Sequence, residues 1–140
     1  MAQHSTIYIT KTDNERLGHL IRQVRDSYDA ANQGYINRLE EELEYAEVVP
    51  SEQIPPDVVT MRSRVELTDL DTNEKMVYSI VFPTEANSDE GKISILAPIA
   101  TAVLGYRRGD EVEFQAPARL RRLKINDILY QPESAGDLDA

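Results

Sequence analysis

Apolar and polar positions over residues 91–114 follow a pattern that predicts a strand, a short helix, a tight turn and a second strand. Ile93 and Ile95 alternate with polar residues, as in a half-buried strand. Pro98 stands where a helix can begin, because its fixed φ and missing N–H cost nothing in a first turn. Gly105 follows an apolar run and can close that helix in the left-handed conformation. One unit of this kind cannot bury its own apolar face, so we expect further strands to surround it.

The N-terminal third carries apolar residues at heptad spacing, which predicts two helices packed along a narrow seam. Residues 12–15 have the form of a capping box, and residues 29–34 supply Asn and Gly for a turn between the helices. Two helices of about 16 residues should run antiparallel, as a hairpin about 24 Å long. A short strand or extended lead-in at residues 6–10 precedes them and could dock on the later sheet. The seam residues are Leu17, Ile21, Val24 and Tyr28 in the first helix and Ile36, Leu39, Leu43 and Ala46 in the second.

The chain beyond Pro50, which should end the second helix, alternates as strands do until the short helix. In the last strand we expect Leu123 and Ile125 to point inward, and Ile128 to join them only if a bulge shifts the register. Strands are predicted at residues 64–67, at residues 75–82 and within residues 120–130.

These elements predict an α+β fold in two parts. Residues 1–50 form a short antiparallel α-hairpin (a coiled coil) with its lead-in, and residues 51–57 form an extended linker. Residues 58–140 form a strongly bent antiparallel sheet wrapped on one short helix. The linker could be a hinge or a fixed corner.

Charge and composition limit the functions that this fold could serve. The 140 residues include 15 Lys and Arg against 25 Asp and Glu, a formal net charge of −10. This excess argues against free-standing binding to nucleic acid backbone, which needs clustered cations, but it suits a protein that enters a basic groove on a larger protein. The absence of cysteine, of a signal sequence and of a membrane-length apolar run leads us to expect a cytoplasmic protein with no membrane contact. Without a phosphate loop, zinc spacing or nucleophile elbow, we expect no enzyme activity, metal or cofactor.

Several motifs occur in the order and at the spacing of a known family. Gly91-x-Ile-Ser-Ile-x-x-Pro-Ile, then Ala102-x-Leu-Gly and Gly109-Asp-x-Val, resemble the C-terminal domain of the bacterial Gre transcript-cleavage factors. Residues 58–65 (VVTMRSRV), Leu96-Ala97-Pro98 and residues 130–137 (YQPESAGD) resemble Rnk, a Gre-related family named for regulation of nucleoside diphosphate kinase. The resemblance implies the FKBP-like version of the bent sheet and RNA polymerase as the partner.

Asp26 and Asp29 are the first candidate site, near the far end of the hairpin. Carboxylates three residues apart on one helix face could share a divalent cation, or they could be ordinary surface acids. In Gre factors a long hairpin enters the polymerase secondary channel, and acidic tip residues help hold a catalytic magnesium ion. Here residues 32–35 (NQGY) replace the Gre tip pattern, and the hairpin is roughly half the length that the resemblance implies. We therefore expect Asp26 and Asp29 to contact the partner rather than to catalyse.

Ala97 and Pro98 are the second candidate site. Cleavage factors carry Asn or Asp, then Ser, then Pro at this helix start, on a loop that contacts polymerase. The resemblance implies that Leu96-Ala97-Pro98 makes a similar but more apolar contact. Helix initiation by Pro98 is the structural alternative.

Arg119, Arg121, Arg122 and Lys124 form a basic stretch at the start of the last strand. Strict alternation would place Arg121 on the same face as Leu123, so the strand begins after Arg121 or a bulge intervenes. These cations either protect an edge strand from association with other sheets or contact an acidic partner.

We expect an RNA polymerase-binding regulator of transcription that docks at the secondary channel and competes with Gre cleavage factors without supporting cleavage. One alternative is a transcript-cleavage factor that acts through the hairpin-tip carboxylates. Another is a peptidyl-prolyl isomerase, suggested by the FKBP-like fold, for which Phe82, Phe114 and a few tyrosines are the available aromatic residues.

Overall fold

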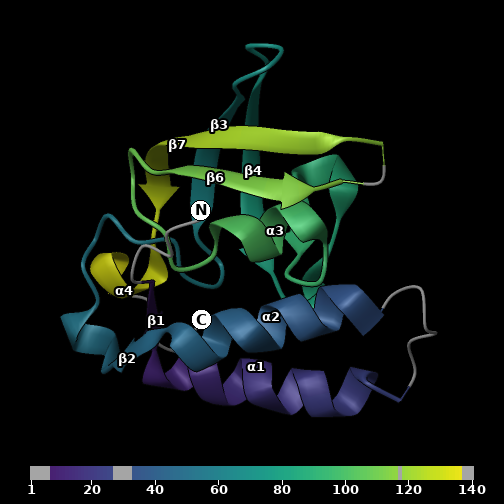
Figure 1. Ribbon diagram of the computed structural model, residues 1–140. Helices are drawn as coiled ribbons and strands as arrows, with labels where there is room; N and C mark the ends of the chain where they lie inside the picture. Colours follow the sequence, from purple (N-terminus) through teal and green to yellow (C-terminus); the bar gives the residue numbers. More distant parts are fainter. Residues whose placement is uncertain (1–6, 27–32, 117, 137–140) are drawn as a thin grey trace.

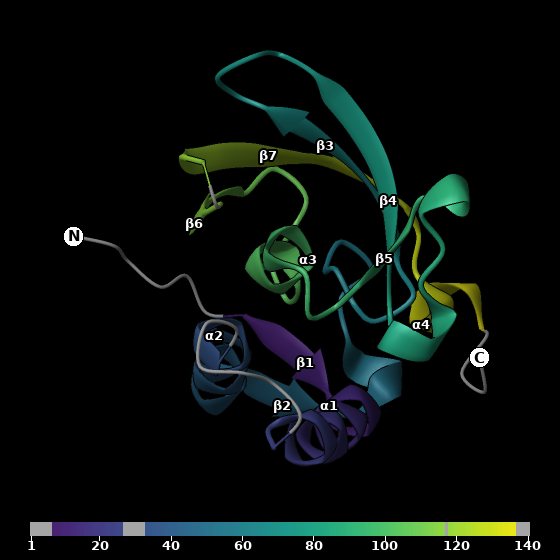
Figure 2. The ribbon, with the colours of Figure 1, turned by 90° about the vertical axis from the view of Figure 1, so that its right-hand side faces the viewer.

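In the computed structural model, which describes residues 7–26, 33–116 and 118–136, a helical hairpin lies beneath a curled sheet. The short helix α3 (Pro98–Val103) lies between the two, with the sheet curled over it and α2 of the hairpin below it (Figures 1 and 2). This arrangement confirms the predicted α+β fold with a hairpin, a bent sheet and one short central helix.

The hairpin consists of α1 (Lys11–Val24) and α2 (Gln33–Tyr45), which run antiparallel side by side (Figure 1). Strand β1 (Tyr8–Thr10) leads directly into α1, and β2 (Glu47–Val49) directly follows Ala46 after α2. The two strands pair in parallel, so the two ends of the hairpin are joined at its base. The helices have 14 and 13 residues, which gives a hairpin about 20 Å long, slightly shorter than predicted.

The N-terminal predictions were wrong in two details. Strand β1 does not join the later sheet; it pairs with β2. It contacts the sheet domain through a hydrogen bond from Tyr8 N to Gly105 O and through the Arg107 guanidinium, which lies over the Tyr8 ring. The N-cap of α1 is Thr10 rather than Thr12, and its Oγ1 accepts a hydrogen bond from the N–H of Asp13 at 3.0 Å. The helix begins earlier because Thr10, at the end of β1, already has the extended backbone that an N-cap needs.

The large sheet has the strand order β5-β4-β3-β7-β6. Three of its pairings are antiparallel, whereas β5 pairs in parallel with β4, because the chain returns to the edge of the sheet through η2 (Pro83–Glu85) and η3 (Ser88–Glu90) rather than through a hairpin turn. The strands are β3 (Arg64–Asp69), β4 (Lys75–Val81), β5 (Lys92–Ser94), β6 (Glu111–Gln115) and β7 (Leu120–Tyr130).

Strand β7 contains the bulge on which the inward position of Ile128 depends. Opposite β3 its register shifts after Ile125, so that Leu67 faces Ile125 but Val65 faces Ile128. Leu123 and Ile125 are fully buried, and Ile128 packs against the same core. The bulge also accounts for the bend of the sheet, since an extra residue on one strand increases its local twist.

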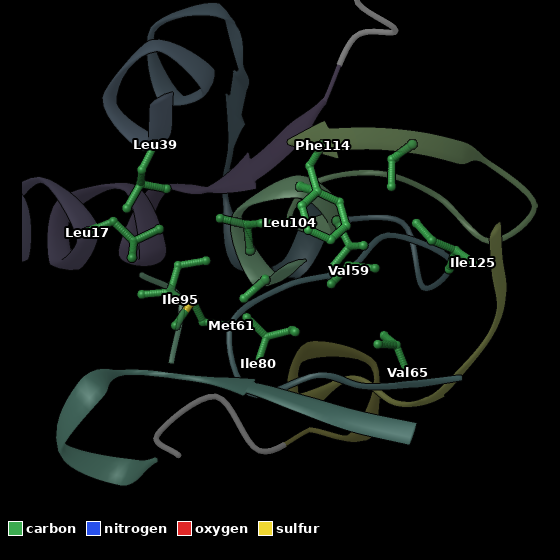
Figure 3. Packing of buried hydrophobic residues seen from close by; sticks show 14 of the residues in the cluster. Leu17, Leu39, Val59, Met61, Val65, Ile80, Ile95, Leu104, Phe114 and Ile125 are labelled. Atoms are coloured by element: carbon green, nitrogen blue, oxygen red, sulfur yellow. The ribbon is translucent and has the colours of Figure 1, made fainter. Parts of the chain in front are cut away.

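One continuous core joins the hairpin to the sheet domain. Leu17 of α1 and Leu39 of α2 lie on the side of Ile95 and Leu104, Phe114 stands beside Leu104, and Ile125 lies on the opposite side of the cluster (Figure 3). The segment predicted as an extended linker begins with η1 (Ser51–Gln53) and buries Ile54. Because the core is shared, the hairpin packs directly against the sheet domain.

Residues 58–63, which we name the crossing segment, run between the hairpin, α3 and the sheet. Val59 exchanges backbone hydrogen bonds with Tyr106 and Gly105, and Ser63 accepts one from Ile80 N. Val58 O accepts from the side chain of Gln131, just before α4 (Pro132–Ala135). Apart from Arg62, the crossing segment is therefore buried, and it is bonded to several neighbouring elements without belonging to a strand.

Gly105 ends α3 as predicted, with a φ of 84° just beyond the C-cap. A Cβ atom at this position would stand 2.8 Å from Cβ of Ile7 and 3.2 Å from O of Tyr8. Glycine is therefore required twice, once for the backbone conformation and once for the approach of the N-terminal segment.

Replacing Gly105 by Ala should lower the free energy of unfolding by about 3 kcal/mol, because strain in the left-handed region adds to a clash with Ile7. Gly109 has a φ of 95°, and a Cβ added there would have no atom within 4 Å, so it is the matched control. Gly109→Ala should cost only about 1 kcal/mol. Urea unfolding of both variants measures the difference, and equal losses would contradict a close contact at Gly105.

Candidate functional site

Of the hairpin tip, the structure describes only the ends of α1 and α2 that lead into it. Asp26 is exposed, two residues after the end of α1, whereas Asp29 lies outside the described residues. Close to Asp26, the Arg25 guanidinium donates to Asn37 Oδ1 at 2.8 Å and to Glu40 Oε1 at 2.7 Å. These contacts hold the two helices together near the tip, and the proximity of Asp26 to Asp29 stays a prediction.

The loop before α3 presents Ala97 and Pro98 as half-buried apolar residues. Ser94 shapes the loop, because its Oγ accepts from Leu96 N at 3.0 Å and its carbonyl accepts from Ala97 N at 2.9 Å. Ala97 occupies the N-cap position of α3 and provides no side-chain cap. The structure thus bears out Pro98 as the first residue of the helix and leaves an apolar surface at the helix start.

The basic stretch at the start of β7 is largely used within the chain. Arg122 pairs with Asp71 at 3.0 Å, and Arg119 bridges Asp71 and Asp69 at 3.2 and 3.3 Å. Arg121 pairs with Asp69 at 3.0 Å and lies over the ring of Phe114. Strand β7 begins at Leu120, so Arg121 does share the inner face with Leu123, at the open end of the sheet.

Asp69, at the end of β3, is the centre of this ion-pair cluster, and its side chain is only 1 % exposed. Burial by itself raises the pKa of Asp69, but the N–H groups of Asp71 and Thr72 and the Arg121 guanidinium outweigh it and lower the pKa to about 2. The cluster therefore stabilises the turn between β3 and β4 and is not a free surface for a partner.

A second ion pair stands beside the crossing segment. The guanidinium of Arg62 donates from both Nε and Nη2 to the carboxylate of Glu85 in η2, and it lies 5.7 Å from the ring centre of Phe82. The hydrogen bond from Arg62 is the main cause that lowers the pKa of Glu85, and Glu85 in turn raises the pKa of Arg62. Arg62 has a φ of 68°, a left-handed conformation that costs a residue with a side chain roughly 1 kcal/mol. These contacts hold its guanidinium in one place.

Asp13 fixes the base of the hairpin to the sheet domain. The residue is 5 % exposed, and its carboxylate accepts a hydrogen bond from the backbone N–H of Met61, in the crossing segment, at 3.1 Å. Nearby, Glu133 of α4 accepts from Oγ1 of Thr60 at 2.7 Å. Burial raises the pKa of Asp13 to about 6; the Met61 hydrogen bond opposes the rise and the negative charge of Glu133 adds to it.

Sequence reasoning missed the residues that hold the crossing segment in place, namely Asp13, Arg62, Glu85 and Gln131. Asp13 and Glu85 look like ordinary surface acids in sequence, and the positive φ of Arg62 leaves no mark there. Gln131 is 2 % exposed and donates to the carbonyls of Pro55 and Val58 at 2.8 Å. The recurrence of YQPESAGD in Rnk was the one available signal for it.

Within the described ranges, no three or more His, Asp and Glu side chains are grouped so that they could hold a metal ion. No helix in that part of the chain is long and apolar enough to cross a membrane. The candidate site consists of three surfaces: the hairpin tip, the loop before α3 and the neighbourhood of Arg62.

Two family models match adjoining parts of the chain. The model described as "Transcription elongation factor, GreA/GreB, C-term" matches residues 54–130, and "Rnk N-terminus" matches residues 6–49. The sheet domain and the hairpin are thus recognised separately.

Individual proteins agree with both models. The chain is 35% identical over 133 residues to the regulator of nucleoside diphosphate kinase of Escherichia coli K12, which covers 94% of this chain and 95% of that protein. It is 39% identical over 99 residues to transcription elongation factor GreA of Bartonella henselae, covering 71% of this chain and 63% of GreA. Among solved structures, a GreA/GreB elongation factor from Nitrosomonas europaea is 38% identical with a TM-score of 0.72, over 89% of this chain and 100% of that one.

These similarities define a regulator of the transcription elongation factor type. The chain belongs to the GreA/GreB family and, within it, to the Rnk group, with a Rnk N-terminal hairpin and a GreA/GreB C-terminal domain.

Asp13→Asn should change how stability depends on pH. Because the folded pKa of Asp13 is raised, wild type loses stability as pH rises from the unfolded pKa near 4 through about 6, whereas Asn keeps an acceptor for Met61 N–H without the charge. The free energy of unfolding of wild type minus that of Asp13→Asn should fall by about 2 kcal/mol between about pH 4.5 and about pH 7.5.

Urea titrations at both pH values measure this difference. The exposed Asp89→Asn is the matched control and should show the same difference from wild type at both pH values. A constant gap between wild type and Asp13→Asn would contradict a raised pKa.

Ala97→Ser should stabilise the protein by about 1 kcal/mol, because a serine Oγ at the N-cap can accept a free N–H of the first turn of α3. Thermal or urea unfolding checks the gain. An unchanged midpoint would mean that the first-turn N–H groups are already satisfied by other contacts.

Proposed function

We propose that this protein binds RNA polymerase at the secondary channel and competes there with Gre cleavage factors without supporting cleavage itself. One observation carries the proposal: residues 54–130 match the GreA/GreB C-terminal domain, whereas residues 6–49 match the Rnk hairpin. The chain therefore combines a domain shared with cleavage factors with a different and shorter projection.

The proposed mechanism is steric. The sheet domain docks beside the channel through the apolar surface at Ala97 and Pro98, and the hairpin, about 20 Å long, occupies the channel entrance. The shared core and the Asp13–Met61 hydrogen bond hold the hairpin at one angle, so docking of the domain aims the hairpin without a separate folding step. The net charge of −10 favours approach to a basic channel and disfavours direct, sequence-specific nucleic acid binding. A cytoplasmic location follows from this function.

The absence of cleavage is also a proposal, supported by the tip residues. The exposed Asp26, joined by Asp29, contacts the channel wall in this scheme, and residues 32–35 lack the pattern by which Gre factors hold magnesium. The competing candidate, a transcript-cleavage factor, would use these same two carboxylates as metal ligands.

A competition experiment on stalled polymerase complexes tests the proposal. Added alone, the protein should leave the nascent transcript at its full length. Added in excess over a Gre cleavage factor, it should reduce transcript cleavage by that factor about tenfold, because two proteins cannot occupy one channel.

Replacing Asp26 and Asp29 together by Asn separates the two candidates. If the pair only contacts the channel, competition persists in the double variant, weakened by no more than a few fold. Transcript shortening by wild type that disappears in the double variant would establish the cleavage factor instead. If neither cleavage nor competition is seen, RNA polymerase is not the partner.

A further inference from the structure

Two hollows lie on either side of the Arg62–Glu85 ion pair, and both residues line both of them. The first, of about 650 Å³, extends over β3, β4 and β5 and includes Arg64, Ser79 and Lys92. The second, of about 570 Å³, extends between α1 and η2. We name the two together the Arg62 groove.

Cations dominate this groove although the chain as a whole is acidic. Arg62 is neutralised by Glu85, and Lys92 pairs with Glu90 at 3.1 Å. Arg16 and Arg64 form no ion pair within the described part of the chain, and Glu85 is the one acidic side chain that lines either hollow. The groove is therefore a local positive surface on a protein of net charge −10.

Apolar side chains accompany these charges. Leu20 and Val24 of α1 face Phe82 and Pro83 across the second hollow. The Arg62 guanidinium covers one face of the Phe82 ring, which leaves less aromatic surface on which a nucleotide base could stack. This combination fits an amphipathic peptide better than a nucleic acid strand.

We propose that the Arg62 groove binds an acidic segment of RNA polymerase that carries an apolar anchor residue, as a contact additional to the hairpin tip and the α3 loop. This inference rests on the proposed function, since it names a surface of the same partner. The acidic residues pair with Arg16 and Arg64 at the two ends of the groove, and the apolar anchor lies between α1 and Pro83. Arg62 needs no rearrangement to take part, because Glu85 and Phe82 already hold its side chain.

The position of the groove gives this contact a mechanical role. One wall is α1 of the hairpin and the other belongs to the sheet domain, so a bound segment would touch both parts of the molecule. Binding there would hold the hairpin against the domain at the moment when the tip enters the channel.

The test compares charge reversal in the groove with charge reversal elsewhere. Arg16→Glu with Arg64→Glu places acids at both ends of the groove, at exposed positions. Lys75→Glu with Lys124→Glu is the matched control: it makes the same change in net charge at exposed residues that both lie opposite Thr68, at the other end of β3 from Arg64. Urea unfolding checks that both variants keep the stability of wild type.

Binding of the full chain to core RNA polymerase is then measured by competition with a labelled Gre factor. Binding of the same variants to a single-stranded RNA oligonucleotide is measured separately. We expect about tenfold weaker polymerase binding and a reduced salt dependence for the groove variant, and wild-type binding for the control. Equal polymerase affinity of wild type and the groove variant would overturn the inference and leave the proposed function intact. RNA binding that the groove variant alone loses, with polymerase binding unchanged, would make the groove a nucleic acid site and overturn it as well. Failure of wild type to bind polymerase would overturn both proposals.

Discussion

The structure depends on the backbone hydrogen bonds of the crossing segment, residues 58–63. This segment bonds to the turn after α3 through Val59, to the large sheet through Ser63 and to Gln131 through Val58. Its Met61 N–H donates to Asp13 of the hairpin. A buried N–H or C=O without a partner is costly, so each of these contacts excludes other positions of the segment. The hairpin, the sheet and α4 are thereby positioned relative to one another by a stretch that has no regular structure of its own.

The crossing segment also brings together the two Rnk-like motifs, which stand at opposite ends of the sheet domain in sequence. Residues 58–65 and residues 130–137 are far apart in sequence, but Gln131 donates to Val58 O and Glu133 accepts from Thr60 Oγ1. The C-terminal motif holds the N-terminal one in place, and that one in turn receives the hairpin. A Gre-type sheet domain is in this way adapted to a short hairpin seated directly against it.

Much of the fold could be predicted from periodicity, and the exceptions have physical reasons. The heptad seam predicted both helices, and the alternation of Leu123 and Ile125 predicted the inner face of β7. The bulge that Ile128 needs in order to point inward is also present. The parallel pairing of β1 with β2 could not be predicted, because three-residue strands have too few positions to show a period. Of the candidate site, the helix start at Pro98 was visible in sequence. The Arg62 groove was not, because it depends on a left-handed residue and on side chains from α1, β3 and η2 that meet only in the folded chain.

The parallel pairing of β1 and β2 separates the length of the hairpin from its attachment. Both helices lie between two strands that are bonded to each other, so the two ends of the hairpin stay joined whatever its length. Inserting seven residues into each helix would extend the projection by about 10 Å while leaving the two strands and the Asp13 contact unchanged. The hairpin can therefore change in length while its attachment stays the same. Relatives with longer or shorter hairpins can evolve without changes in the sheet domain that carries them.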